Sequence, residues 1–408
     1  MLIPQLFRSS LLGAEVGVAI PTIYLSVLTT AAILETAKRK KRANLSSPSI
    51  EVAEFDFAIL IPAHNEEVLL PGLLASLAAV DYPKDKYSIY IVADNCTDTT
   101  AQLARKVGWV HVFERFDQEK RGKGYALNWL WQKLHEERSI HHDAYVIVDA
   151  DSIVDSKFLQ AMARELAKGS HAMQADSTVL NATDSPGTVL RLIAISLFYH
   201  IRALGRNALG ASSTLNGNGM CFSRSLLERY PWQAYSLSED YQYYINLVKH
   251  GELVRYVPDA VVSSYMPASF KQMRTQDIRW ESSGSDTVWR ITGELLQAGF
   301  RLRKFVCFEA VMELLTPPLS LLASCVFMLL LASLFLWSLP ALIIALLLLA
   351  GLIYYVGTGI YFLHFPRTIY KTMLYVPGFM LWKLWVILVL SKSKKYTNQW
   401  IRSSRPLP

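Results

Sequence analysis

Two aspartates one residue apart, Asp149 and Asp151, are the residues whose types and spacing most directly suggest chemistry. They follow an apolar run at 145–148, and two carboxylates at the end of a buried strand can both face a hard divalent cation, leaving room for water and phosphate oxygens. Aspartate is also common in solvated turns, which is the alternative interpretation. Because acidic residues also follow other apolar runs, we favour a site for Mg²⁺ or Mn²⁺ at these two aspartates.

Further candidate residues lie at the ends of two earlier apolar runs: Pro62 closes the first run and is followed by His64 and Glu66, and Asp94 and Asn95 follow the second. Ligands of open α/β sheets bind outside the carboxyl ends of the strands, so these residues are candidates for nucleotide contacts. A structural alternative exists for the second cluster, because Asp98 has the side chain of a helix N-cap.

Three further motifs carry charge or little side-chain bulk. Residues 121–124 (RGKG) place Lys123 at a helix start, where it could bind an anionic group such as a pyrophosphate. The alternative is a basic loop exposed to solvent. Residues 216–219 (NGNG) have little side-chain bulk, so their backbone can approach another group closely; a plain tight turn is the alternative. Glu239 and Asp240 lie at the start of a predicted helix. Acidic side chains there stabilise the helix by interacting with its dipole, so capping alone could explain both residues.

The elements that position these residues alternate between strands and helices. Apolar runs without polar alternation occur at 57–62, 87–92, 109–113 and 144–148, separated by helical patterns. Such runs are typical of parallel strands covered on both faces. The predicted fold class is therefore α/β, with the ligand site at the carboxyl ends of the strands.

The rest of the chain is strongly apolar. The 408 residues are 52% hydrophobic and 18% charged, against roughly a quarter charged in soluble proteins. Residues 16–34 are long enough to cross a bilayer, and the bases at 38–42 behind them argue against a cleaved signal peptide. Residues 314–337 and 340–363 predict a transmembrane hairpin. The positive-inside rule then places the N-terminus outside and the globular part after Lys38 in the cytoplasm, as expected for a multi-pass protein of the cell (inner) membrane.

Two other segments suit the membrane surface. Residues 301–313 mix charged and apolar side chains, as in an interfacial helix. Residues 375–390 carry Lys383 midway and predict a re-entrant or interfacial segment, with a fourth span as the alternative. The predicted division is an N-terminal transmembrane helix with its basic stop at 1–42, a cytoplasmic domain at 43–300, the interfacial helix at 301–313, the hairpin at 314–363, and an interfacial or re-entrant segment with a cytoplasmic tail at 364–408.

Charge and cysteine content exclude other classes. The formal net charge is +7, but the bases gather beside apolar segments, which indicates contact with an anionic membrane face and no nucleic acid. Four scattered cysteines form neither a disulfide framework nor a zinc motif, which favours a reducing compartment. One more motif, QDIRW at 276–280, precedes the C-terminal apolar part, and an Arg–Trp pair there is often only an interfacial anchor.

The order of these motifs, PAHNEE, DNCTD, RGKG, DAD, NGNG, SED and QDIRW followed by apolar spans, closely resembles the membrane-bound members of glycosyltransferase family 2, which include cellulose, chitin and hyaluronan synthases. The resemblance covers residues 58–280. It implies a GT-A fold, a UDP-sugar donor, a divalent cation and inversion at the anomeric carbon. It also implies residue roles: Glu66 and Asp94, with Pro62, His64 and Asn95, at the nucleotide; Lys123 at the donor; Asp149 and Asp151 at the metal and diphosphate; Asp240 of the Glu239–Asp240 pair as general base; Gln276, Arg279 and Trp280 at the acceptor and pyrophosphate.

The resemblance leaves the acceptor open. The chain is expected to be a processive synthase of a β-linked polysaccharide, or a transferase adding one sugar to a lipid-linked, polyprenyl-phosphate or membrane-proximal glycan acceptor. A membrane scaffold without catalysis is a third alternative, opposed by the intact motifs. Membrane lipids are expected partners, and a homo-oligomer or an export partner is a further possibility.

Overall fold

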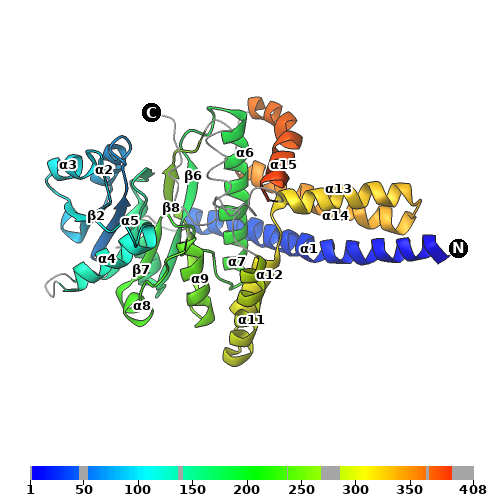
Figure 1. Ribbon diagram of the computed structural model, residues 1–408, viewed down its shortest axis with the longest axis horizontal. Helices are drawn as coiled ribbons and strands as arrows, with labels where there is room; N and C mark the ends of the chain where they lie inside the picture. Colours follow the sequence, from blue (N-terminus) through cyan, green and yellow to red (C-terminus); the bar gives the residue numbers. More distant parts are fainter. Residues whose placement is uncertain are drawn as a thin grey trace.

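The computed structural model describes residues 2–45, 54–136, 141–236, 238–267, 285–363 and 367–387. Its sheet has the strand order β3-β2-β1-β4-β7-β6-β8-β5. The strands are β1 (Phe57–Ala63), β2 (Tyr87–Asp94), β3 (His111–Arg115), β4 (Ala144–Ile147), β5 (Ser152–Val154), β6 (Ala172–Val179), β7 (Met220–Ser223) and β8 (Val254–Ser264). Figure 1 shows this sheet at one end of the molecule and a group of long helices at the other.

The predicted strands are present, but the sheet is mixed. β1 runs parallel to both β2 and β4, as the apolar runs predicted, so their carboxyl ends meet at one edge. The four predicted strands pair in parallel, whereas β7 runs antiparallel to its neighbours β4 and β6, and β5 runs antiparallel to β8. Between β6 and β7 the chain passes through a long helix at Pro186–Ala208 and the turn at 216–219, and it enters the sheet again in the reverse direction.

Helices cover both faces of the sheet and explain why its strands lack polar alternation. One apolar core lies under α2 (Leu70–Ala78), α3 (Thr100–Lys106) and α5 (Phe158–Ala167). The other lies under α4 (Lys123–Glu136), α8 (Arg224–Arg229), α9 (Glu239–Lys249), α11 (Ser285–Leu302) and α12 (Phe305–Leu315). A short 3₁₀ turn, η1 (Lys84–Lys86), leads into β2.

A third core joins the sheet domain to the long apolar helices. It contains side chains of α1 (Leu2–Leu45), α6 (Pro186–Ile195), the π-helical η2 (Ser196–Arg202), α7 (Ala203–Ala208), α13 (Leu319–Phe335) and α14 (Leu339–Phe362). α1, α13 and α14 pack side by side (Figure 1). Close crossings occur at glycines: a Cβ on Gly205 would overlap the backbone of Leu28, and one on Gly359 would overlap Leu197.

Three described helices are long and apolar enough to cross a membrane, at Ser10–Arg42, Pro186–Ala208 and Leu339–Phe362. The first and third correspond to predicted spans. The second was not predicted, and it is mostly buried against β6, α1 and α14. The predicted span at 314–337 begins later, because Pro317 and Pro318 separate α12 from α13 and the two helices are bent by 66°.

The segment predicted as one surface helix at 301–313 is the junction of two helices. α11 ends at Leu302 and α12 starts at Phe305, with Arg303 at a positive φ of 51° between them. Glu309 and Glu313 are buried rather than exposed on a surface. That part of the prediction was wrong, because both acids have buried arginine partners far away in the sequence.

Those partners form a buried polar network between the sheet domain and the apolar helices. Arg206 donates from Nε and Nη2 to the two carboxylate oxygens of Glu309, at 2.6 and 2.7 Å, and from Nη2 to the Tyr244 hydroxyl at 2.8 Å. Arg202 donates to Glu313 at 3.1 Å, and the Tyr24 hydroxyl of α1 donates to Glu309 at 2.6 Å. Because Tyr244 belongs to α9, the network ties that helix to α7, α12 and α1.

The described chain ends with η3 (Arg367–Tyr375) and α15 (Val376–Trp385). α15 packs against α13, and η3 packs against α6. The predicted interfacial or re-entrant segment at 375–390 therefore begins as a helix of 10 residues. Residues 388–408 lie outside the described residues, so an interfacial or re-entrant segment, rather than a fourth transmembrane span, stays a prediction.

Candidate functional site

The carboxyl ends of β1, β2 and β4 bring the predicted polar residues to one edge of the sheet. The register pairs Phe57 with both Tyr87 and Ala144, so the three strands begin level, and β4 ends at Ile147 opposite Leu60 of β1. Pro62 lies within β1 rather than after it. His64 follows β1, and its Nδ1 lies 2.7 Å from the backbone carbonyl oxygen of Asp94 at the end of β2. The first two predicted clusters are therefore in contact.

Asp94 is held by Arg115, which belongs to none of the motifs identified in the sequence. Nη1 of Arg115 lies 2.6 Å from the Asp94 carboxylate, and both side chains are buried. Burial raises the pKa of Asp94 above its ordinary value, although Arg115 opposes the shift. Asn95, at a positive φ of 51°, accepts from the backbone N–H of Asp117 at 2.9 Å. Arg115 closes β3, and only the pairing of β3 with β2 identifies it as part of the site.

Glu66 lines the same cavity, and its loop is tied to the start of α3. Its backbone N–H donates to the Thr100 hydroxyl at 2.8 Å. Asp98 accepts from the backbone N–H of Thr100 at 3.0 Å, but the N-cap position of α3 is Thr99, one residue later than the N-cap considered in the sequence. Asp98 also accepts from the backbone N–H of Glu67 at 3.2 Å, so it shapes the loop that carries Glu66.

Lys123 is the centre of an acidic cluster. Its Nζ lies 2.5 Å from an Asp149 oxygen and 3.9 Å from a Glu239 oxygen, and it also donates to the backbone carbonyl of Gly217. Burial disfavours the charged amine, but the surrounding carboxylates of Asp149, Glu239 and Asp240 outweigh burial and raise the pKa of Lys123. The lysine therefore stays charged among the acids.

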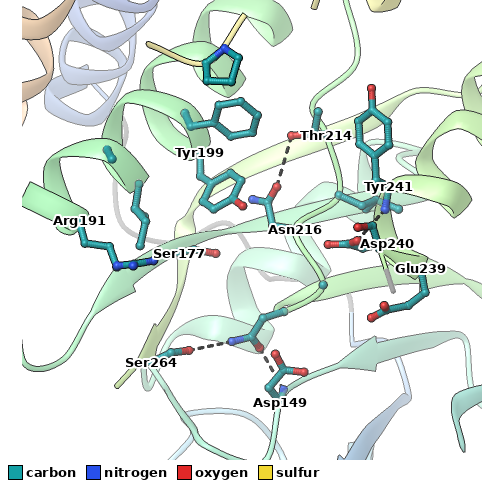
Figure 2. A pocket seen from close by; sticks show the side chains of 18 of the residues that line it. Asp149, Ser177, Arg191, Tyr199, Thr214, Asn216, Glu239, Asp240, Tyr241 and Ser264 are labelled. Atoms are coloured by element: carbon teal, nitrogen blue, oxygen red, sulfur yellow. Dashed lines mark hydrogen bonds between the residues drawn. The ribbon is translucent and has the colours of Figure 1, made fainter. Parts of the chain in front are cut away.

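The two acids at the start of α9 face this cluster, and Figure 2 shows them beside Asp149. Burial, and next the neighbouring Asp240, raises the pKa of Glu239 to about 7. Burial also raises the pKa of Asp240, against the opposing effect of Lys123. A buried carboxylate of raised pKa next to a cation is the environment of many catalytic bases, and also of structural ion pairs.

The turn at 216–219 has the close-approach role considered for it. A Cβ on Gly217, whose φ is +79°, would lie 3.1 Å from the Asp240 carboxylate. Asn218 accepts from the backbone N–H of Asp149 at 3.1 Å and donates to Ser152 at 2.7 Å and to Ser264 at 3.1 Å. Asn218 therefore fixes the loop that carries Asp149 and Asp151, a role that the motif indicated only as a possible backbone approach.

The donor set at Asp149 and Asp151 fits a divalent cation only together with a ligand. No group of three His, Cys, Asp or Glu side chains arranged to hold a metal occurs among the described residues. Mg²⁺ is commonly bound by one or two carboxylates plus water and substrate phosphates, so two aspartates with a diphosphate are sufficient. Asp151 is buried, 3.3 Å from the Ser152 hydroxyl, and Asp149 is paired with Lys123.

One cavity of about 3020 Å³ connects these residues, with Asp94, Lys123, Asp149, Asp151 and Asp240 on its wall. The structure thus brings together Pro62, His64, Glu66, Asp94, Asn95, Lys123, Asp149, Asp151, Glu239 and Asp240. The predicted residues Gln276, Arg279 and Trp280 lie outside the described residues, so their roles stay predictions.

The chain is similar to several known proteins. It is 25% identical over 261 residues to the probable glycosyltransferase YdaM of Bacillus subtilis, covering 62% of this chain and 60% of that protein. It is 26% identical over 248 residues to the poly-beta-1,6-N-acetyl-D-glucosamine synthase of Staphylococcus aureus, covering 60% and 58%. The chain therefore spans about three fifths of the length of these curated relatives.

A solved structure, the mannosyltransferase PcManGT from Pyrobaculum calidifontis in complex with GDP-Man and Mn²⁺, aligns with 90% of this chain and 99% of its own, at 20% identity and a TM-score of 0.47. The family model described as "Glycosyltransferase like family 2" matches residues 54–283, more than half of the chain, and this range contains the sheet and the acidic cluster. The chain therefore belongs to glycosyltransferase family 2, with a GT-A type fold and several candidate membrane helices.

Proposed function

We propose that this chain is an inverting, metal-dependent transferase that moves a sugar from a UDP-sugar to an acceptor hydroxyl and forms a β-glycosidic bond. The observation that supports it best is the convergence of Asp149, Lys123, Glu239 and Asp240 in one cavity at the end of β4. Membership of the family supports glycosyl transfer in general. The name of the Staphylococcus aureus relative supports a UDP-N-acetylhexosamine-like donor and polysaccharide synthesis as one outcome.

Asp240 is the proposed general base. As the acceptor oxygen attacks the anomeric carbon, its proton passes to the Asp240 carboxylate, and the bond from that carbon to the UDP oxygen breaks with the electron pair leaving on UDP. A base must lie within about 2.6–3.2 Å of the acceptor oxygen, and burial raises the pKa of Asp240, which makes its carboxylate a better proton acceptor. With attack and departure on opposite faces of the carbon, an α-linked donor gives a β-linked product.

The leaving diphosphate is the proposed partner of Lys123, Asp149 and Asp151. A bound Mg²⁺ or Mn²⁺ would neutralise negative charge as UDP leaves. Asp149 and Asp151 would hold the ion, while Lys123, kept charged by the surrounding acids, would move from Asp149 towards the phosphates. Glu66, Asp94 and Asn95, with Pro62 and His64, would line the uridine side, and Gln276, Arg279 and Trp280 the acceptor side.

Two acceptor classes follow from different observations. Processive elongation of a β-linked polysaccharide, for which an export partner would be needed, is favoured by the similarity to a polysaccharide synthase. Single addition to a lipid-linked acceptor is favoured by the extension of the cavity towards the apolar helices. In both cases the helices α1, α13 and α14 would anchor the enzyme in the cell membrane, with the catalytic domain in the cytoplasm.

The test uses the full-length protein in detergent with a panel of UDP-sugars and either Mg²⁺ or Mn²⁺. Release of UDP that requires one particular UDP-sugar and a divalent cation would support the proposed donor and metal. Product sizing then distinguishes the acceptor classes, because a ladder indicates processive synthesis and one added sugar indicates single addition. Absence of UDP release with every sugar and both metals would refute the proposal.

A further inference from the structure

The cavity that holds the acidic cluster extends far beyond a nucleotide site. Its volume is about 3020 Å³, whereas pockets for small ligands are roughly 300–1,000 Å³. One part is lined by the donor-side residues at the ends of β1, β2 and β4. The other part is lined by α6, η2, α13, α14 and α15. Because both parts belong to one cavity, a single ligand can reach from the apolar helices to Asp240.

The second part, which we call the tail site, has mostly aliphatic walls. It is represented by Ile193 and Leu197 on α6 and η2, Ala323 on α13, Ile353 and Val356 on α14, and Phe379 on α15. α14 has 24 residues and is a candidate membrane span, and α13 packs along it. The tail site therefore lies partly at the depth of the bilayer if α14 crosses it.

The chemistry of these walls distinguishes between possible occupants. A sugar chain needs hydrogen-bond partners, since its hydroxyls lose water on entry, and aromatic faces on which to stack. The tail site contains the aromatic rings of Phe198, Tyr199, Tyr355 and Phe379, but most of its side chains are aliphatic and offer sugar hydroxyls no hydrogen bonds, whereas they favour a hydrocarbon chain. The cations Arg191 on α6 and Lys383 on α15 also line the cavity, and they suit an anionic group between the chain and the reacting hydroxyl or phosphate. Figure 2 shows Arg191 across the pocket from Glu239 and Asp240.

We propose that the tail site holds the hydrocarbon tail of a membrane-lipid acceptor, whose head group reaches Asp240 and receives the sugar. This proposal rests on the proposed glycosyl transfer and names its acceptor class. The acceptor enters as an amphipathic molecule: the tail lies against α6, α13 and α14, and the head group lies in the polar part of the same cavity. Transfer itself follows the step given above, with the lipid oxygen as nucleophile.

Gly357 offers a direct way to fill the tail site. It lies on α14 and lines the cavity, and a Cβ built on it meets no atom within 4 Å. Gly357→Phe therefore adds a ring in the space proposed for the tail without clashing at the backbone.

Gly17→Phe is the matched control. Gly17 also lies on an apolar helix, and a Cβ added to it meets no atom within 4 Å, but Gly17 does not line the cavity.

The experiment reconstitutes the full-length wild type and both variants in lipid nanodiscs with the UDP-sugar and metal that give UDP release. The acceptor probes are dioleoylglycerol and undecaprenyl phosphate, each incorporated separately, and a soluble β-linked N-acetylglucosamine oligosaccharide. We expect sugar incorporation into one lipid, which identifies a neutral or an anionic head group. We expect Gly357→Phe to lower that incorporation by about tenfold or more, as when roughly two or three methylene groups lose their apolar contacts, and Gly17→Phe to match the wild type.

UDP binding, measured by calorimetry, shows whether each variant retains its donor site and therefore its fold. Equal lipid glycosylation by Gly357→Phe and Gly17→Phe, with UDP binding intact in both, would overturn the tail site while leaving glycosyl transfer standing. Transfer by the wild type to the oligosaccharide alone would also overturn it. Failure of the wild type to release UDP from any UDP-sugar would instead refute the proposed function. If Gly357→Phe loses UDP binding, Ala194→Phe, which fills the cavity from an exposed position on α6, replaces it in the same comparison.

Discussion

The buried pair between Arg206 and Glu309 gives the most quantitative prediction. Arg206 is 1% exposed and Glu309 is 5% exposed. Glu309 accepts two bonds from the guanidinium, so Glu309→Gln leaves the buried charge of Arg206 without its carboxylate. Removing one partner of a buried pair costs about 3–5 kcal/mol. We therefore expect the free energy of unfolding to fall by that amount.

A matched surface pair provides the control. Arg39 and Asp259 lie 2.6 Å apart, but their side chains are 35% and 65% exposed. Exposed pairs contribute about 0–1 kcal/mol, so Asp259→Asn should have little effect. A second comparison is the double variant Arg206→Met with Glu309→Leu, which removes both charges and should recover most of the loss, because an apolar replacement of a buried pair is often neutral.

The measurement is denaturant unfolding of the full-length protein in detergent, followed by Trp fluorescence, with UDP release measured in parallel. Because Arg206 also donates to Tyr244 on α9, Glu309→Gln should lower turnover as well as stability. The reasoning would be refuted if Glu309→Gln cost no more than Asp259→Asn, or if the double variant were less stable than the single one.

Three further predictions concern the acids of the site. Asp240→Asn should lower turnover by about 10²–10⁴-fold, the range for loss of a general base, while UDP binding measured by calorimetry stays nearly unchanged; loss of both together would remove the assignment of the base. Asp151→Ala should abolish the metal-dependent part of UDP binding, and unchanged calorimetric binding would contradict its role as a metal ligand. The pKa of Glu239 is raised from 4.5 to about 7, mainly by burial and then by Asp240, so the folded state binds a proton that the unfolded state releases near pH 4.5. The free energy of unfolding should therefore fall as the pH rises from about 4.5 to about 7, by up to about 3 kcal/mol, and Glu239→Gln should flatten this dependence in unfolding titrations across that range.

The sequence predicted those parts of the fold and site that local pattern determines. The apolar runs before His64, Asn95 and Asp149 are strands, and the acids after them meet because parallel strands end at one edge. Arg115 and Asn218 were not assigned, because their roles come from pairings across the sheet and not from their neighbours in the chain.

The helix formed by α6, η2 and α7 was missed for a related reason. Its apolar residues are interrupted by arginines, so its sequence matches neither the pattern of a transmembrane helix nor that of a buried core helix. Arg202 and Arg206 become tolerable inside the molecule only because Glu313 and Glu309 lie beside them, more than 100 residues later. The same long-range pairing explains why the two glutamates were predicted on a membrane surface and are buried instead.

The glycine crossings between α1, α7, η2 and α14 have a consequence for how the membrane acts on the enzyme. Gly205 lies against the backbone of Leu28, and Gly359 lies against Leu197, so no side chain separates these helices as a flexible spacer. α14, with 24 residues, is about 36 Å long at 1.5 Å per residue, longer than a hydrocarbon core of about 30 Å. In a bilayer such a helix tilts to match the thickness. Because the catalytic domain is fixed to the same helices, the tilt would also set the angle at which the sheet edge faces the lipid head groups, making membrane thickness a determinant of access to the active site.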